Sequence, residues 1–235
     1  MESFQHEDFL RLCGRGEPGE IVNLLVQLSQ KTKPDIKFFN YYKEVPVSSP
    51  AELLYVFDDT LTCRSSELQN QAIKNCRYTL IRSPQLPHDV YATAIFNDRT
   101  NEITLTEFAF VELLLERRTT LRVKIDGLFR VTVEAGSDSF IAKLKDLSLG
   151  GCALEIYDKS LLGKFAYFYI NFSFELKNRP QPMQLRIMTR FLRFEGEEES
   201  PARGIFLFEQ DKRSEDLIGM YIAQRQTEII KELKI

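Results

Sequence analysis

The 235-residue sequence has no tryptophan, only two histidines and four cysteines, and a formal net charge of only −3. Cys13, Cys63, Cys76 and Cys152 lie far apart without a C-x-x-C pair, so with two histidines they form no familiar zinc spacing. The near balance of 31 basic and 34 acidic residues argues against a general nucleic-acid coat or a polybasic membrane-surface protein. We therefore expect reduced, buried thiols, no metal, no cofactor and no DNA partner.

Long apolar runs are also missing. No stretch approaches the roughly 20 apolar residues that a membrane-spanning helix needs. The first ten residues, MESFQHEDFL, are acidic and polar, whereas a signal peptide is basic and then apolar. The sequence therefore predicts a cytoplasmic protein without membrane insertion, and its 43% of hydrophobic residues is enough for a folded core.

Residues 1–33 predict a helical N-terminal segment. Ile21, Leu24, Leu25 and Leu28 have the i, i+3, i+4, i+7 spacing of one helix face. The preceding DFLRLC is amphipathic and also indicates helix. The GRGEPG sequence between the two matches the letters of the dinucleotide fingerprint, but that motif needs a strand before it. A helix–helix connection is the preferred interpretation.

Short apolar or alternating runs then follow, separated by turn sequences such as FDDT and FNDRTNE. This pattern is typical of antiparallel strands, with a hairpin turn expected at residues 97–101. Residues 65–75 fit either a short helix or a polar loop. A second series of strands begins after residue 120 and ends in a helix from about Ser214.

The sequence thus predicts a mainly β protein with two small antiparallel β-barrel modules, an N-terminal helical segment and a C-terminal helix. The expected divisions are residues 1–33 for the helical segment, 34–112 for the first module and 113–235 for the second. Residues 113–122 form a bridge between the two modules.

Three arginines in this bridge and a D-x-S-x-x-G turn form the one constellation that suits a ligand. Arginine binds phosphate oxygens or the O6/N7 edge of guanine in bidentate fashion. An aspartate accepts from guanine's other edge, a serine hydroxyl donates to phosphate, and glycines let the backbone approach closely. On chemistry alone, a guanine-nucleotide site and a surface turn beside a basic strand end both stay open. The residues are Arg117, Arg118, Arg122, Asp146, Ser148, Gly150 and Gly151.

An R-x-x-x-R motif followed by [D/N]-x-S-x-x-G at the opening of a β-barrel resembles the PilZ domain, which binds the bacterial second messenger cyclic di-GMP. The strand pattern after Arg118, and the segment 203–208 followed by a terminal helix, are similar to the same family. With a β module in front of it, the chain resembles the two-domain YcgR type, known as flagellar brake proteins. The PilZ likeness covers residues 113–235.

This resemblance implies that Arg118 and Arg122 grip phosphate and guanine edges, and that Asp146 and Ser148 contact guanine and phosphate. Gly151 matches the closing glycine, and Gly150 is an additional one. An arginine at position 117 is similar to family members that hold an intercalated pair of cyclic di-GMP molecules.

The implied protein is a bacterial receptor and not an enzyme. Ligand binding at the bridge changes the relative orientation of the two β modules and regulates a protein partner. The expected partner is a flagellar motor, switch or stator protein, with recruitment to the flagellar basal body. Control of exopolysaccharide or attachment machinery, or a ligand-independent structural adaptor, stay open as alternatives. Both a monomer and a homodimer are compatible with the sequence.

Overall fold

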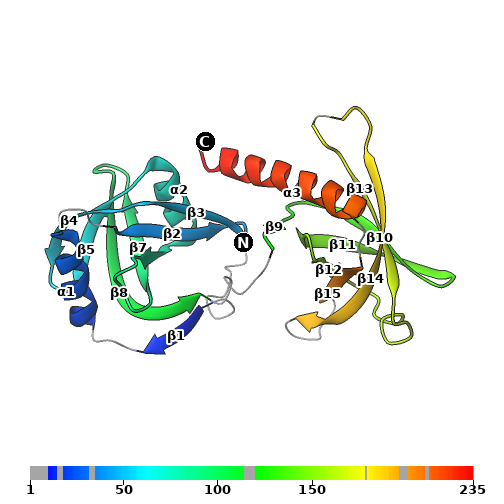
Figure 1. Cartoon of the computed structure of the whole chain (residues 1–235), viewed down its shortest axis with the longest axis horizontal. Coiled ribbons are helices and arrows are strands. Elements are labelled where there is room, and N and C mark those ends of the chain that lie inside the picture. Colours follow the sequence, from blue (N-terminus) through cyan, green and yellow to red (C-terminus); the bar gives the residue numbers. More distant parts are fainter. Residues whose placement is uncertain are drawn as a thin grey trace. The chain divides into compact units, whose positions relative to one another are not determined.

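In a computed structural model, the chain divides into two compact units (Figure 1). The first unit comprises Met1–Tyr42, Pro46–Thr119 and Lys231–Ile235, and the second comprises Lys43–Val45 and Thr120–Ile230. The structure describes residues 10–14, 18–31, 35–113, 120–177, 179–195, 201–209 and 212–234.

The N-terminal unit is an antiparallel sheet with strand order β3-β2-β6-β7-β8-β5-β4, to which β1 is added along β8. Figure 1 shows that this sheet curls, and no pairing among the described residues joins β3 to β4, so it is a half-barrel. Its elements are β1 (Leu10–Gly14), α1 (Pro18–Ser29), β2 (Lys37–Tyr42), β3 (Val45–Pro50), β4 (Glu52–Phe57), β5 (Thr60–Arg64), α2 (Glu67–Cys76), β6 (Tyr78–Arg82), β7 (Asp89–Asn97) and β8 (Glu102–Leu113).

The core of this unit follows from alternation along the strands. Val90, Ala92 and Ala94 of β7 are buried, while the residues between them are partly exposed. α1 contributes Ile21 and Leu25 to the same core, as its helical spacing predicts. The expected hairpin turn joins β7 to β8.

The ambiguous residues 65–75 form a helix. Ser66 is the N-cap of α2, and its Oγ accepts a hydrogen bond from the Gln69 backbone N–H at 3.3 Å. A buried polar network then ties α2 to the sheet: Asn40 Oδ1 accepts from Gln69 Nε2 at 2.7 Å and from Thr79 Oγ1 at 2.9 Å. These three side chains are inaccessible to solvent. Interactions with β2 and β6 therefore fix a helix whose sequence alone was indecisive.

The expectation of helix across residues 1–33 is wrong for Leu10–Gly14, which forms β1. The described pairing of β5 with β8 covers residues 103–105, which leaves the later part of that edge open. β1 pairs antiparallel with residues 110–113 of this edge. A five-residue amphipathic segment fits both periodicities, so the unpaired backbone of the long strand decides its conformation. Residues 1–9, 15–17 and 32–34 lie outside the described residues.

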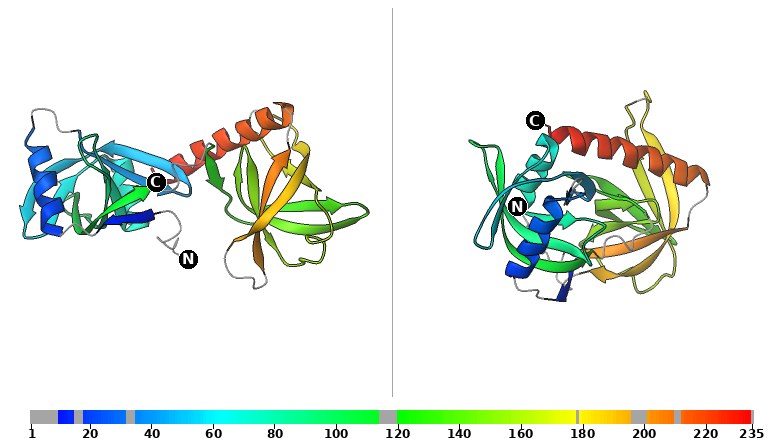
Figure 2. Two further views of the ribbon diagram at one scale, coloured as in Figure 1. Left: turned by 60° about the horizontal axis from the view of Figure 1, so that its bottom comes forward. Right: turned by 60° about the vertical axis from the view of Figure 1, so that its left-hand side comes forward.

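The C-terminal unit is a closed six-stranded antiparallel barrel. Its sheet order is β10-β13-β14-β15-β12-β11-β9, and an additional pairing of β10 with β11 closes the ring (Figures 1 and 2). β9 adds to the second half of β11. The elements are β9 (Arg122–Lys124), β10 (Arg130–Ala135), β11 (Asp138–Ser148), β12 (Gly151–Ile156), β13 (Phe168–Phe174), β14 (Met183–Glu195), β15 (Ala202–Glu209) and α3 (Lys212–Glu232).

Aromatic side chains fill this barrel. Phe168 and Phe206 are fully buried, with ring centroids 5.9 Å apart in an edge-to-face arrangement. α3 packs against the barrel through Tyr221, whose ring lies 4.8 Å from that of Phe174. The mainly β, antiparallel fold with a C-terminal helix is therefore confirmed.

Candidate functional site

The D-x-S-x-x-G sequence begins on β11. Arg122, the last residue of the R-x-x-x-R motif, lies on β9, which pairs with β11. β9 pairs with β11 so that Arg122 is opposite Ser148 and Lys124 is opposite Asp146. A β-bulge between Leu144 and Asp146 changes the alternation of β11 just before the motif. Directly opposed residues of an antiparallel pair point to the same face, so Asp146 and Ser148 share the face that carries Arg122.

The Asp146 carboxylate is the centre of this site. Its side chain is 5% exposed, and its Oδ1 lies 3.5 Å from Arg122 Nε. Its Oδ2 accepts a hydrogen bond from Arg203 Nη2. A buried carboxylate is costly unless it is paired, and here two arginines neutralise it.

Arg203 was not among the predicted site residues. In the sequence it is only the first residue of the segment 203–208, and no motif marks it. Pairing of β15 with β12 brings Arg203 opposite Glu155 and within reach of Asp146, a long-range register that no local pattern contains. Its Nε also lies 3.2 Å from Glu195 Oε2 on β14.

Ser148 and the two glycines shape the turn between β11 and β12. Ser148 Oγ donates a hydrogen bond to the Gly151 carbonyl oxygen at 3.1 Å and is buried. A Cβ on Gly151 would lie 2.2 Å from the Phe206 carbonyl oxygen, so only glycine fits against β15 there. A Cβ on Gly150 would meet no atom within 4 Å. Gly151 is therefore required by the fold, and Gly150 is not.

Both arginines are partly exposed. Their Nε atoms are buried and face carboxylates, Asp146 Oδ1 at 3.5 Å from Arg122 and Glu195 Oε2 at 3.2 Å from Arg203, but the side chains as a whole are 21% and 38% exposed. A guanidinium carries five N–H donors in a planar fork that matches phosphate geometry. The arrangement can therefore accept an anionic group beside an aspartate that recognises N–H donors. Arg117 and Arg118, the other predicted cations, lie outside the described residues.

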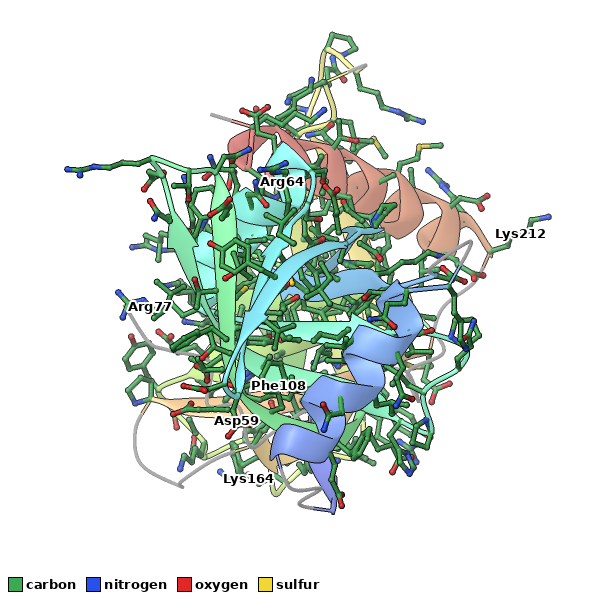
Figure 3. All side chains as sticks on the ribbon, turned by 90° about the vertical axis from the view of Figure 1, so that its left-hand side faces the viewer. Asp59, Arg64, Arg77, Phe108, Lys164 and Lys212 are labelled. Atoms are coloured by element: carbon green, nitrogen blue, oxygen red, sulfur yellow. The ribbon has the colours of Figure 1, made fainter. Side chains whose placement is uncertain are left out.

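The GRGEPG sequence has a different context from the one expected, because a strand, β1, precedes it and a helix, α1, follows it. β1 nevertheless pairs antiparallel with β8, whereas the dinucleotide fold uses a parallel strand–helix–strand unit. An Asp59 carboxylate oxygen, on the strand turn labelled in Figure 3, lies 3.4 Å from where a Cβ on Gly19 would be. The Asp59 side chain therefore lies beside the first turn of α1.

The described cysteines are free and suited to a structural role. Burial raises the pKa of the Cys63 thiol to about 12 and that of Cys76 to about 11. Burial also raises the pKa of Cys152 well above its usual value. These thiols are therefore protonated at neutral pH and are poor nucleophiles.

Within the described ranges, no three His, Cys, Asp or Glu side chains cluster in a way that suits a metal ion. Among the described helices, none combines the length and apolar character that a membrane span requires.

Comparison with known proteins shows that this chain is similar to several solved structures. No family profile matches the sequence, and no curated protein matches it. The chain is similar to the Bacillus subtilis inhibitor of motility MotI/DgrA, with 13% identity, 82% of this chain and 96% of that chain covered, and a TM-score of 0.40. It is also similar to Escherichia coli YcgR in complex with c-di-GMP, with 16% identity, 97% of each chain covered and a TM-score of 0.40. The PilZ domain of CeSA from a cellulose-synthesising bacterium covers 44% of this chain and 97% of its own length, at 22% identity and a TM-score of 0.32.

Proposed function

We propose that the chain is a receptor for cyclic di-GMP, which binds at the C-terminal barrel beside Arg122, Asp146 and Ser148. The observation that carries the proposal is the approach of Arg122 Nε to Asp146 Oδ1, at 3.5 Å, on one face of the barrel. The two residues come from separate motifs, and the pairing of β9 with β11 brings them together.

The chemistry of the two groups is complementary to the ligand. Arg122 provides a fork for a phosphate or for guanine O6/N7, and Asp146 accepts from guanine N1–H and the exocyclic amine. Arg117 and Arg118 add two positive charges just before β9 in sequence. We expect Arg117 to favour a second bound molecule, because a pair of cyclic dinucleotides brings more negative charge than Arg118 and Arg122 neutralise.

Isothermal titration of the full chain with cyclic di-GMP tests the proposal. The wild type is expected to bind in the micromolar range or tighter, and Arg122→Ala is expected to abolish binding. Arg186→Ala is the matched control, because Arg186 pairs with Glu134 at 3.0 Å on the outer face of β14 and has no contact with Asp146 among those described. Absence of binding by folded wild type would refute the receptor function. The stoichiometry reports whether one molecule or a pair binds.

The proposed receptor acts without catalysis. Cyclic di-GMP incubated with the chain should be recovered unchanged by chromatography, and appearance of a linear dinucleotide would contradict this.

The proposed output is regulation of flagellar motility through a motor, switch or stator protein. Binding to the arginine-rich segment that precedes β9 would change the relative orientation of the two units, and the ligand drives this change only through different affinities for the two arrangements. Small-angle scattering with and without cyclic di-GMP measures the change. Swimming of cells that produce the wild type or Arg122→Ala, at raised cyclic di-GMP, tests the output.

A further inference from the structure

We propose that Arg203 is a positioning residue for guanine recognition: it orients the Asp146 carboxylate, while Glu195 holds Arg203 in place. This inference rests on the proposed function. It assigns a role in base specificity to a residue on β15, outside the two sequence motifs.

The strand registers explain how Arg203 reaches Asp146. Asp146 of β11 pairs with Ala153 of β12, and Ala153 pairs with Ile205 of β15. Arg203 lies two residues before Ile205, so it projects from the same face. Ala153 stands between the two strands with only a methyl group and is fully buried. The long Arg203 side chain can therefore cross β12 and bond to Asp146.

The two arginines hold different oxygens of the carboxylate. Arg203 Nη2 donates to Oδ2, whereas Arg122 Nε lies 3.5 Å from Oδ1. The terminal torsion of an aspartate is broad, so contacts at both oxygens are what fix the plane of the group. A carboxylate has about four lone-pair sites, so sites remain for guanine N1–H and the exocyclic amine.

Arg203 also keeps Asp146 paired when the ligand binds. In the proposed complex, Arg122 directs part of its guanidinium to the ligand and so interacts less with Asp146. A buried carboxylate left without a partner would be strongly destabilising. Arg203 remains as its counter-charge and is itself restrained, because its Nε lies 3.2 Å from Glu195 Oε2.

Binding of two ligands, cyclic di-GMP and cyclic di-IMP, shows whether Arg203 orients Asp146 or only adds positive charge. Cyclic di-IMP lacks the exocyclic amine of guanine but carries the same phosphates. By titration calorimetry on the full chain, wild type is expected to prefer cyclic di-GMP about tenfold, because a site built around a hydrogen bond discriminates against a ligand that lacks it. Arg203→Ala is expected to raise the Kd for cyclic di-GMP about tenfold, which corresponds to about 1.4 kcal/mol. The preference should fall to about twofold.

Arg203→Lys and Glu195→Gln are the milder variants. The lysine keeps the charge without the fork, and the glutamine weakens the restraint on Arg203, so both should reduce the preference by less than Arg203→Ala does. They carry the test if Arg203→Ala does not fold. Arg186→Ala, which removes an arginine paired with Glu134 elsewhere on the barrel, should change neither affinity nor preference.

The outcomes distinguish this inference from the proposed function. If wild type binds cyclic di-GMP but the Arg203 variants keep its affinity and preference, the positioning role is refuted. Equal losses for both ligands would also refute it, since they would reflect charge alone. If folded wild type binds neither ligand, the receptor function fails and the inference fails with it.

Discussion

The two adjacent glycines of the β11–β12 turn give a sharp test of the fold around the site. Gly151→Ala should destabilise the protein, and Gly150→Ala should not. A Cβ on Gly151 would lie 2.2 Å from the Phe206 carbonyl oxygen, while real Cβ atoms essentially never approach within 3.0 Å. The difference between these values requires β12 and β15 to separate locally by about 0.8 Å.

The expected cost of Gly151→Ala combines two effects. Overpacking a close contact costs about 1–3 kcal/mol, and weakening one backbone hydrogen bond costs about 0.5–1.5 kcal/mol. We therefore expect the free energy of unfolding to fall by about 2–4 kcal/mol. Gly150→Ala should stay within about 0.5 kcal/mol of wild type, because its Cβ would meet no atom within 4 Å.

Urea denaturation followed by circular dichroism measures both variants. Hydrogen exchange gives a local measurement, because the Phe208 amide donates to the Gly150 carbonyl oxygen at 3.0 Å. Its protection should drop in Gly151→Ala and persist in Gly150→Ala. Equal stabilities for the two variants, within about 0.5 kcal/mol, would refute the argument that the close approach of β15 requires glycine at 151.

Three further predictions concern other parts of the chain. Cys63, whose pKa burial raises to about 12, should react slowly with iodoacetamide at pH 8 in the folded protein and rapidly in urea; fast labelling of the folded protein would contradict its burial. Asn40→Ala should lower the free energy of unfolding by about 2–3 kcal/mol, because Gln69 Nε2 loses its buried acceptor, and a loss below about 0.5 kcal/mol would contradict this. Burial raises the pKa of Glu228, but hydrogen bonds from Lys177 and Arg225 outweigh this effect and leave the pKa below that of an ordinary glutamate. The resulting stabilisation is present above the usual carboxyl pKa and is lost as pH falls through the lowered value. Glu228→Gln should therefore be less stable than wild type at pH 7 and equally stable in acid. Urea denaturation at both pH values measures this difference.

Local patterns in the sequence predicted most of the strands. The hairpin at residues 97–101 and the alternating β7 combine turn residues with period-two burial, and both agree with the structure. The helix at residues 67–76 stayed undecided because its buried polar side chains look like loop residues in sequence. Only their partners on β2 and β6 show why they are inside.

Long-range pairing accounts for what the sequence could not predict. Leu10–Gly14 became a strand because the edge of β8 was available there, a fact about the sheet and not about those five residues. Arg203 joins Asp146 for the same reason, since its place depends on the register of β15 against β12. The two sequence motifs predicted Arg122, Asp146 and Ser148 as candidate site residues, and the pairing of β9 with β11 places these three residues near one another.

If the proposed ligand binds at this site, the hydrogen bond that Ser148 already makes limits what its side chain can contribute. Ser148 has one hydroxyl proton, and it is used in the bond to the Gly151 carbonyl oxygen that closes the turn. Donation from Ser148 to a phosphate would therefore break that bond, and the gain would be offset by the loss. The guanidinium of Arg122 has no such conflict, because its side chain is 21% exposed and its described ion pair uses only the Nε side. In the proposed complex, phosphate affinity should therefore depend on Arg122 and the arginines that precede it in sequence, while Ser148 fixes the turn beside Asp146.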